Sequence, residues 1–262
     1  MRAMEPADYL HAAYGSGIYR RRIEIRVGEG LVRGELEDDF HRFGAAVRHD
    51  GRRVLEARGS ATRFPWTTCA EAASLLPQLA GLALTRSLCA IARAREPRAH
   101  CTHLFDLASL LVARAAAGGG DRIYEVEVPD LREGRTRARL WRDGAPLLDF
   151  EVRGLELDGP PPFGGRRLAG GFAQWAEAEL EADLAEAAQV LRRAVLIAGG
   201  RRFDMERMES AVPFASLTRG ACYSFQPARV ARALRKRGSV RDFSRRPGAL
   251  LAGSGEKTGP AG

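Results

Sequence analysis

Three consecutive glycines, Gly118-Gly119-Gly120, separate two stretches of the chain that show the same order of patterns. Each stretch begins with alternating apolar and polar residues, which is typical of strands, and continues with apolar residues at helical spacing. A run of glycines favours a loop and therefore marks a boundary. The sequence predicts an α+β protein with a lead-in over 1–19, a first sub-domain over 20–117, a second sub-domain over 121–246 and a disordered tail over 247–262.

The first sub-domain is predicted to be a three-stranded antiparallel sheet followed by helices. Its strands are expected over 23–27, 31–48 and 53–64, with a hairpin turn of the Asp-Gly type between the last two. The second sub-domain repeats this order on a smaller scale. It is expected to contain a meander of three strands, a loop over 158–171 that is rich in proline and glycine, and one long amphipathic helix over 172–198.

The strand predicted over 31–48 carries acidic side chains on the face that its apolar residues share. Side chains alternate between the two faces of a strand, so Phe43, Ala45 and Val47 direct the odd-numbered residues toward the core. Acids on such a face are costly to bury unless they are paired, bound to a ligand or solvated in a cleft. The alternative is that this end of the strand leaves the core and its acids lie in water. The polar side chains concerned are Glu35, Glu37, Asp39 and His41.

Two cysteines, Cys69 and Cys101, are predicted to lie in the first turns of helices. The positive end of a helix dipole lowers the pKa of a thiol, which makes it a better nucleophile or metal ligand. Histidines lie on both sides of Cys101, namely His100 and His103. Asp106 follows His103 at a spacing that lets a carboxylate orient an imidazole on a helix surface.

The four cysteines lack the close spacing of a zinc finger or a disulfide framework. Cys89 and Cys222 are therefore interpreted as small buried core residues. No apolar stretch is long enough to cross a membrane, and residues 1–14 lack the pattern of a signal peptide. From these features we expect a cytoplasmic protein without a membrane partner, whose cysteines are free thiols.

The residues above predict a metal-binding protein or metalloenzyme whose site lies in the first sub-domain. Zinc and iron both accept mixed sulfur, nitrogen and oxygen ligands. The expected ligands are Asp39, Cys101 and His103, with His41, Cys69 and His100 as alternates.

The alternative is a metal-free enzyme that uses the same cysteines and histidine. Cys101 or Cys69 would be its nucleophile, His103 its base, and Asp106 the residue that orients the base. A small carboxylated or thioester substrate would suit this chemistry, and it would meet the arginine-rich face of the basic stretch over 229–246. Both chemistries stay open at this point, and so does the oligomeric state.

The formal net charge is +8, carried almost entirely by arginine. The densest basic stretch lies over 229–246, where a predicted short helix would place Arg229, Arg232 and Lys236 on one face. Such a face can bind phosphates. A third hypothesis is therefore that the protein is a non-catalytic RNA-binding or protein-binding module. The stretch lacks the interleaved aromatic residues of a stacking platform, so a solvated surface is favoured and nucleic acid is not the expected partner.

Several short motifs resemble those of a bacterial family that is catalogued as a domain of unknown function. The similarity covers roughly residues 17–251. It is carried by EDDFHRF (37–43), RFPWTTC (63–69), CTHLFDLA (101–108), GACYSFQP (220–227) and GSVRDFS (238–244).

Residues 31–115 also resemble, remotely, the U-type iron–sulfur cluster scaffold proteins. Asp39 matches an Asp of that family, and His100-Cys101-Thr102 matches its His-Cys-Ser motif. Glu37 stands where that family has its first cysteine, and Cys69 lies about four residues past the place of the second. The resemblance therefore implies a scaffold-like fold that holds a mononuclear metal site or a repurposed active site.

Overall fold

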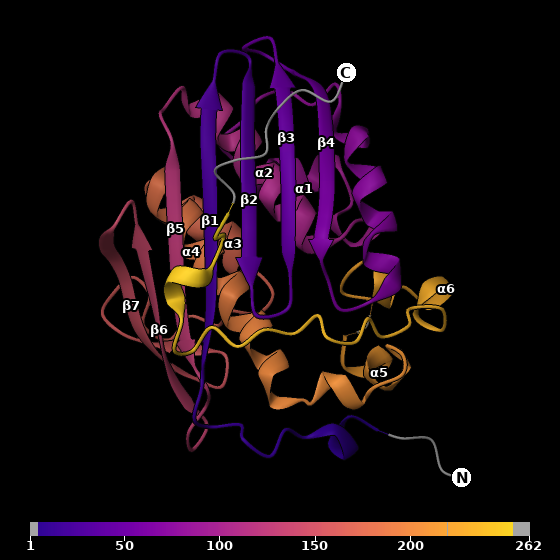
Figure 1. The fold of residues 1–262 in the computed structure, drawn as a ribbon. Coiled ribbons are helices and arrows are strands. Elements are labelled where there is room, and N and C mark those ends of the chain that lie inside the picture. Colours follow the sequence, from indigo (N-terminus) through magenta and orange to yellow (C-terminus); the bar gives the residue numbers. More distant parts are fainter. Residues whose placement is uncertain (1–4, 219, 254–262) are drawn as a thin grey trace.

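One antiparallel sheet of eight strands organises the protein. The structure, a computed structural model, describes residues 5–218 and 220–253. The strands lie in the order β4-β3-β2-β1-β5-β6-β7-β8, so β1 and β5 meet in the middle of the sheet (Figure 1). Their bounds are β1 Ile18–Gly28, β2 Leu31–Asp38, β3 Arg42–His49, β4 Val54–Arg63, β5 Arg122–Pro129, β6 Arg135–Arg142, β7 Ala145–Arg153 and β8 Glu156–Asp158.

The α+β class is confirmed, but the prediction of a three-stranded N-terminal sheet is wrong. The strand expected over 31–48 is two strands, β2 and β3, and the N-terminal half contributes four strands to the sheet. The predicted boundary at Gly118 to Gly120 does coincide with the connection from the helices back to the sheet. However, β5 pairs with β1, with Ile23 opposite Tyr124, so the two predicted sub-domains share one sheet.

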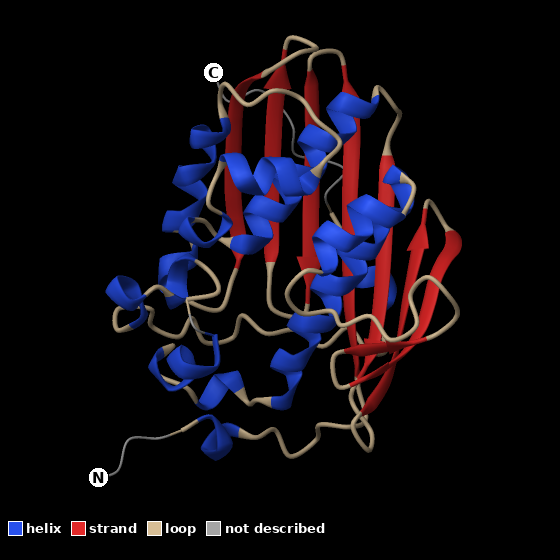
Figure 2. Ribbon diagram, turned by 180° about the vertical axis from the view of Figure 1, so that it is seen from behind, coloured by secondary structure: helices blue, strands red, loops and turns tan. Residues whose placement is uncertain are grey.

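The four longer α-helices cover one face of the sheet, as seen from behind in Figure 2. The second helix, α2, packs on β2 and β3, and α4 packs on β5 and β6. The helix predicted over 172–198 is interrupted at Leu180 and Glu181. None of the helices that the structure describes is long and apolar enough to cross a bilayer. The bounds are α1 Leu88–Ala94, α2 Thr102–Ala117, α3 Phe172–Glu179 and α4 Ala182–Ala198.

The other helices of the described chain are 3-10 helices or α-helices of four residues. The stretch after Pro65, which the sequence predicts as an α-helix, forms two 3-10 helices, η2 and η3, and Pro77 in η3 has no N–H to donate to a preceding turn. The segment after α4 runs along one end of the sheet (Figure 1). The short helices are η1 Pro6–Tyr9, η2 Thr67–Cys69, η3 Glu71–Leu79, η4 Pro97–Ala99, η5 Gly199–Arg202, η6 Met205–Arg207, η7 Val212–Phe214, α5 Ala215–Thr218, η8 Tyr223–Phe225, α6 Pro227–Val230 and η9 Pro247–Ala249.

Gly34 allows α2 to approach β2 closely. A Cβ atom built on Gly34 would lie 2.8 Å from Leu111 Cδ2 and 3.1 Å from Leu107 Cδ1. Carbon atoms in a packed core lie about 3.5–4.0 Å apart, so a side chain at this position does not fit without movement. The missing side chain therefore fixes the depth at which α2 lies on the sheet.

We expect Gly34→Ala to lower the free energy of unfolding by about 1–3 kcal/mol, because the added methyl group overpacks the interface between β2 and α2. Urea denaturation followed by circular dichroism measures the change. The matched control is Gly28→Ala, since a Cβ there meets no heavy atom closer than 3.4 Å. Equal stability of the two variants would contradict the close approach of α2.

The face of the sheet opposite the helices is crossed by the end of the described chain, drawn in yellow in Figure 1. Glu37 points to this face, where its carboxylate pairs with Arg63 at 3.1 Å and accepts the Leu251 N–H at 2.7 Å. Leu250 and Leu251 are buried. Residues 247–253 of the predicted tail thus have a described structure, and 254–262 lie outside the described residues.

The basic stretch over 229–246 is largely engaged with the rest of the protein. Arg232 forms an ion pair with Glu71, and Arg235 is buried, where it pairs with Glu206 and donates to the Pro65 carbonyl. The helix in this stretch, α6, ends at Val230, so the prediction of one helical basic face is wrong.

Candidate functional site

The turn between β2 and β3 places a carboxylate beside an imidazole. Asp38 ends β2, Asp39 and Phe40 form the turn, and the Asp38 N–H donates to the His41 carbonyl at 2.9 Å. Asp38 Oδ1 accepts the backbone N–H groups of Phe40 and His41 at 2.9 and 2.8 Å. An aspartate often stabilises a turn in this way. Asp38 and His41 therefore lie opposite each other on the face of the sheet that the helices cover.

This turn also overturns the prediction that the odd-numbered residues of 31–48 share the core face. In β2 the even-numbered residues point toward the helices, while in β3 the odd-numbered residues do so. A two-residue turn puts positions 38 and 41 on one face, whereas an uninterrupted strand would put them on opposite faces. His41 points inward as predicted; Glu35, Glu37 and Asp39 do not lie on the core face with it.

Asp38 is a fully buried carboxylate held by groups of opposite charge. Its Oδ1 accepts from His41 Nδ1 at 2.9 Å, and its Oδ2 accepts from Arg21 Nη2 at 2.7 Å and from the Tyr19 hydroxyl at 2.8 Å. Burial would raise the pKa of Asp38, but His41 and Arg21 outweigh it and hold that pKa well below its ordinary value. Asp38 is therefore ionised.

The ring of His103, from the first turn of α2, stacks on the ring of His41. The two ring centroids are 3.8 Å apart, with an angle of 30° between the planes. Burial lowers the pKa of His103 well below its ordinary value, and His41 and Arg21 lower it further. The ring is therefore neutral, and its Nε2 is buried without a hydrogen-bond partner among the described residues.

Asp38, His41 and His103 form a compact group of candidate metal ligands. Each offers one ligand atom, and these atoms all lie within 4.8 Å of one another. All three residues are buried. A neutral imidazole with a free nitrogen, next to a second imidazole and a carboxylate, is a donor set that divalent transition metals accept.

The two histidines open onto an apolar cavity of about 250 Å³. Segment 196–225 forms much of its wall, including Phe203 and Phe214. Three of the four cysteines lie on this wall: Cys69, Cys101 and Cys222. The structure thus brings two histidines and three thiols to one cavity.

The expectation that helix dipoles make the Cys69 and Cys101 thiols acidic is wrong. Burial raises the pKa of Cys69 to about 12, that of Cys101 well above its ordinary value, and that of Cys222 as well. Cys101 precedes α2 as its N-cap residue, and Cys69 lies in a 3-10 helix of only three residues. Desolvation of the thiolate outweighs the dipole of such helix ends. Without a metal, these cysteines are therefore protonated and poor nucleophiles.

The other predicted site residues lie elsewhere. The Asp39 carboxylate pairs with Arg201 outside the cavity, and burial raises its pKa to about 7 although Arg201 opposes this. Asp106 pairs with Arg193 and lines a different cavity from His103. The ring of His100 packs 5.3 Å from that of Phe105 and is absent from the wall of the candidate site.

A scan against models of protein families found no match to this chain, and a search of curated proteins found none.

Proposed function

We propose that this protein binds a divalent transition metal, zinc or iron, at His41 and His103, as a metal-binding protein or metalloenzyme. The observation that carries the proposal is a pair of buried imidazoles beside a buried carboxylate, in a group whose ligand atoms lie within 4.8 Å of one another. The unpartnered Nε2 of His103 supports it, because a buried nitrogen without a hydrogen bond is costly unless a ligand satisfies it.

We assign Asp38 to the support of His41 rather than to the metal itself. Its two oxygens already accept hydrogen bonds from two backbone N–H groups, one imidazole, one hydroxyl and one guanidinium. Because a carboxylate can only accept, His41 Nδ1 must carry the proton that it shares with Asp38. When the ring is neutral, as metal binding requires, the lone pair of His41 therefore resides on Nε2. A carboxylate that orients a histidine in this way is a common partner of metal-binding imidazoles.

The thiols of the same cavity lie outside the group of donors within 4.8 Å of one another, so one of them would have to move to become the further ligand that two imidazoles need. Cys69, Cys101 and Cys222 share the wall with the two histidines. A bound cation favours the thiolate and so opposes the effect of burial on the thiol pKa. The apolar remainder of the cavity would receive a small substrate or exclude water from the metal.

We expect protein purified without an affinity tag to contain close to one equivalent of zinc or iron by mass spectrometry. Because metal that binds only the folded state stabilises it, adding metal at about 100 times Kd should raise the free energy of unfolding by about 2.7 kcal/mol. His103→Leu should abolish both the bound metal and this stabilisation. The comparison is made by thermal unfolding with and without a chelator.

His11→Gln serves as the control, because His11 is exposed and lies outside the cluster; it should bind metal as the wild type does. Metal below about a tenth of an equivalent in the wild type, together with melting that neither zinc nor iron changes, would sink the proposal.

A metal-free acid–base function is the second candidate, favoured by the hydrogen bond between Asp38 and His41 at the edge of an apolar cavity. His41 would act as the base through Nε2. The protonated cysteines and the pairing of Asp106 with Arg193 speak against a Cys101–His103–Asp106 nucleophile. The metal measurement separates the two candidates, since only the first loses stability with a chelator.

A further inference from the structure

A second cavity, of about 300 Å³, lies between the sheet and the four longer α-helices. Its wall comes from β1, β2, α1, α2, α3 and α4, and it shares no residue with the wall of the candidate metal site. Its volume is at the small end of the range for ligand sites in proteins.

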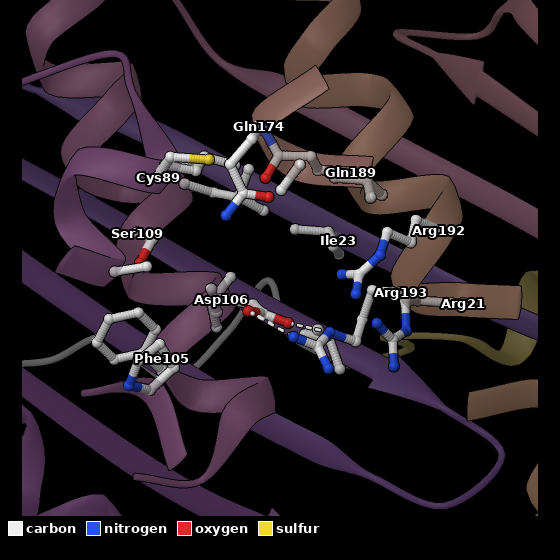
Figure 3. A pocket seen from close by; sticks show the side chains of 18 of the residues that line it. Arg21, Ile23, Cys89, Phe105, Asp106, Ser109, Gln174, Gln189, Arg192 and Arg193 are labelled. Atoms are coloured by element: carbon white, nitrogen blue, oxygen red, sulfur yellow. Dashed lines mark hydrogen bonds and ion pairs between the residues drawn. The ribbon is translucent and has the colours of Figure 1, made fainter. Parts of the chain in front are cut away.

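Arginines gather on one side of this cavity, as the close-up in Figure 3 shows for Arg21, Arg192 and Arg193. The charge of Arg21 is balanced by Asp38, and that of Arg193 by Asp106. Arg192 forms no ion pair with a carboxylate of the described residues, although the charge of the nearby Asp106 favours its protonated form. The wall therefore carries one partly buried guanidinium that has no carboxylate of its own.

The guanidinium of Arg192 is held in place by one hydrogen bond but has further donors without a partner among the described residues. Its Nε donates to the Leu168 carbonyl at 2.7 Å, which fixes the direction of the group. Its Nη atoms have no hydrogen-bond partner in residues 5–218 and 220–253, and Figure 3 shows the group pointing into the cavity. Burial lowers the pKa of Arg192, with Arg193 as a second cause. An anion would compensate this cost.

The rest of the wall is mostly apolar, with a few polar groups that converge on the space. Apolar side chains include Ile23, Leu36, Leu88, Phe105, Leu110 and Val190. The Ser109 hydroxyl, on the side away from the arginines in Figure 3, is buried and has no hydrogen-bond partner among the described residues. A buried hydroxyl without a partner points to a ligand that would satisfy it.

We propose that this cavity binds a small organic monoanion: a carboxylate attached to an apolar body. The carboxylate accepts hydrogen bonds from the Nη groups of Arg192, while the apolar body lies against Ile23 and Leu110. Of the two wall arginines that form no ion pair within the described chain, Arg192 is partly buried and Arg93 is exposed. One partly buried guanidinium favours a monoanion over a phosphate dianion, because a second negative charge would be buried without a counterion. The inference does not depend on the proposed metal function.

The test is calorimetric titration of the full chain, freed of metal, with hexanoate, with the neutral hexanamide of the same shape, and with inorganic phosphate. We expect hexanoate to bind at least about tenfold more tightly than hexanamide, as a charge-assisted hydrogen bond provides. Arg192→Gln should remove this difference. Arg167→Gln, at an exposed arginine outside the cavity, should leave it unchanged.

A second variant guards against loss of folding in Arg192→Gln. Ala173→Phe fills the cavity from α3 and should block hexanoate while Arg192 stays intact. The proposal is overturned if hexanoate binds no better than hexanamide, if phosphate binds and hexanoate does not, or if Ala173→Phe binds hexanoate as the wild type does.

Discussion

Replacing Asp38 with alanine is expected to lower the free energy of unfolding by about 3–5 kcal/mol. The substitution leaves the Arg21 guanidinium, which is 2% exposed, without its counterion. It also leaves the Tyr19 hydroxyl and two backbone N–H groups of the turn without their acceptor. Chemical denaturation of the metal-free protein measures the change, so that loss of a bound metal does not contribute.

The controls for this prediction separate charge from shape. Asp38→Asn keeps the size of the side chain and one acceptor oxygen but removes the charge. It should therefore lower the free energy of unfolding by less than Asp38→Ala does. Asp158→Ala removes an exposed aspartate and should change stability by less than about 0.5 kcal/mol. If Asp38→Ala cost no more than Asp158→Ala, the buried cluster would contribute nothing to the fold.

Replacing Arg201 with alanine is also expected to lower the free energy of unfolding by about 3–5 kcal/mol at pH 8. Arg201 lies between two buried carboxylates: its Nε donates to Asp130 at 2.7 Å and its Nη1 pairs with Asp39. Without the guanidinium, these two buried carboxylates lose their shared counterion. Urea denaturation at pH 8 and at pH 5 measures the loss.

The loss should shrink at lower pH, because a protonated carboxyl needs no counterion. Burial already raises the pKa of Asp39 from 3.8 to about 7 with Arg201 present, and removing Arg201 raises it further. A carboxyl whose pKa is higher in the folded state destabilises that state increasingly as pH rises through this range. The neighbouring Arg202→Ala, at an exposed residue, should show neither effect. A loss for Arg201→Ala that is equal at both pH values would contradict an origin in the charge of Asp39.

The sequence predicts the class of fold because periodicity is local. The alternation over 23–27 and 53–64 and the helical spacing over 101–117 all correspond to elements of the structure. The extra strand of the N-terminal half has no such signal, because β2 and β3 are joined by only a few residues, none of them a glycine. The pairing of β1 with β5 is set by tertiary packing and likewise leaves no local signal.

The candidate site is predictable in part for the same reason. His41 follows from the inward pattern of its strand, and His103 from its place beside Cys101 at the start of a predicted helix; both lie at the site. The alternation of the sequence favours Asp39 over Asp38 as the inward-facing acid. The apolar–polar pattern continues through the turn and does not show that the two strands on either side of it differ in which positions face inward. The motif EDDFH does contain a signal: an Asp whose side chain can accept the two N–H groups that follow it favours a tight turn. The partners Tyr19 and Arg21 come from a strand that lies far from this motif in the sequence.

The order of strands in the sheet has a consequence for how the protein folds. In the sheet as described, only the pairing of β1 with β5 joins strands that are not neighbours in the sequence. The hairpins close over short loops, whereas this pairing, from Ile18 opposite Pro129 to Ile25 opposite Arg122, closes a loop of about 100 residues and costs more chain entropy. Asp38, His41 and α2 all belong to the half that precedes this closure. The wall over 196–225 follows it in the chain, so the histidine pair can form early, while the cavity around it is complete only after the C-terminal segment has docked.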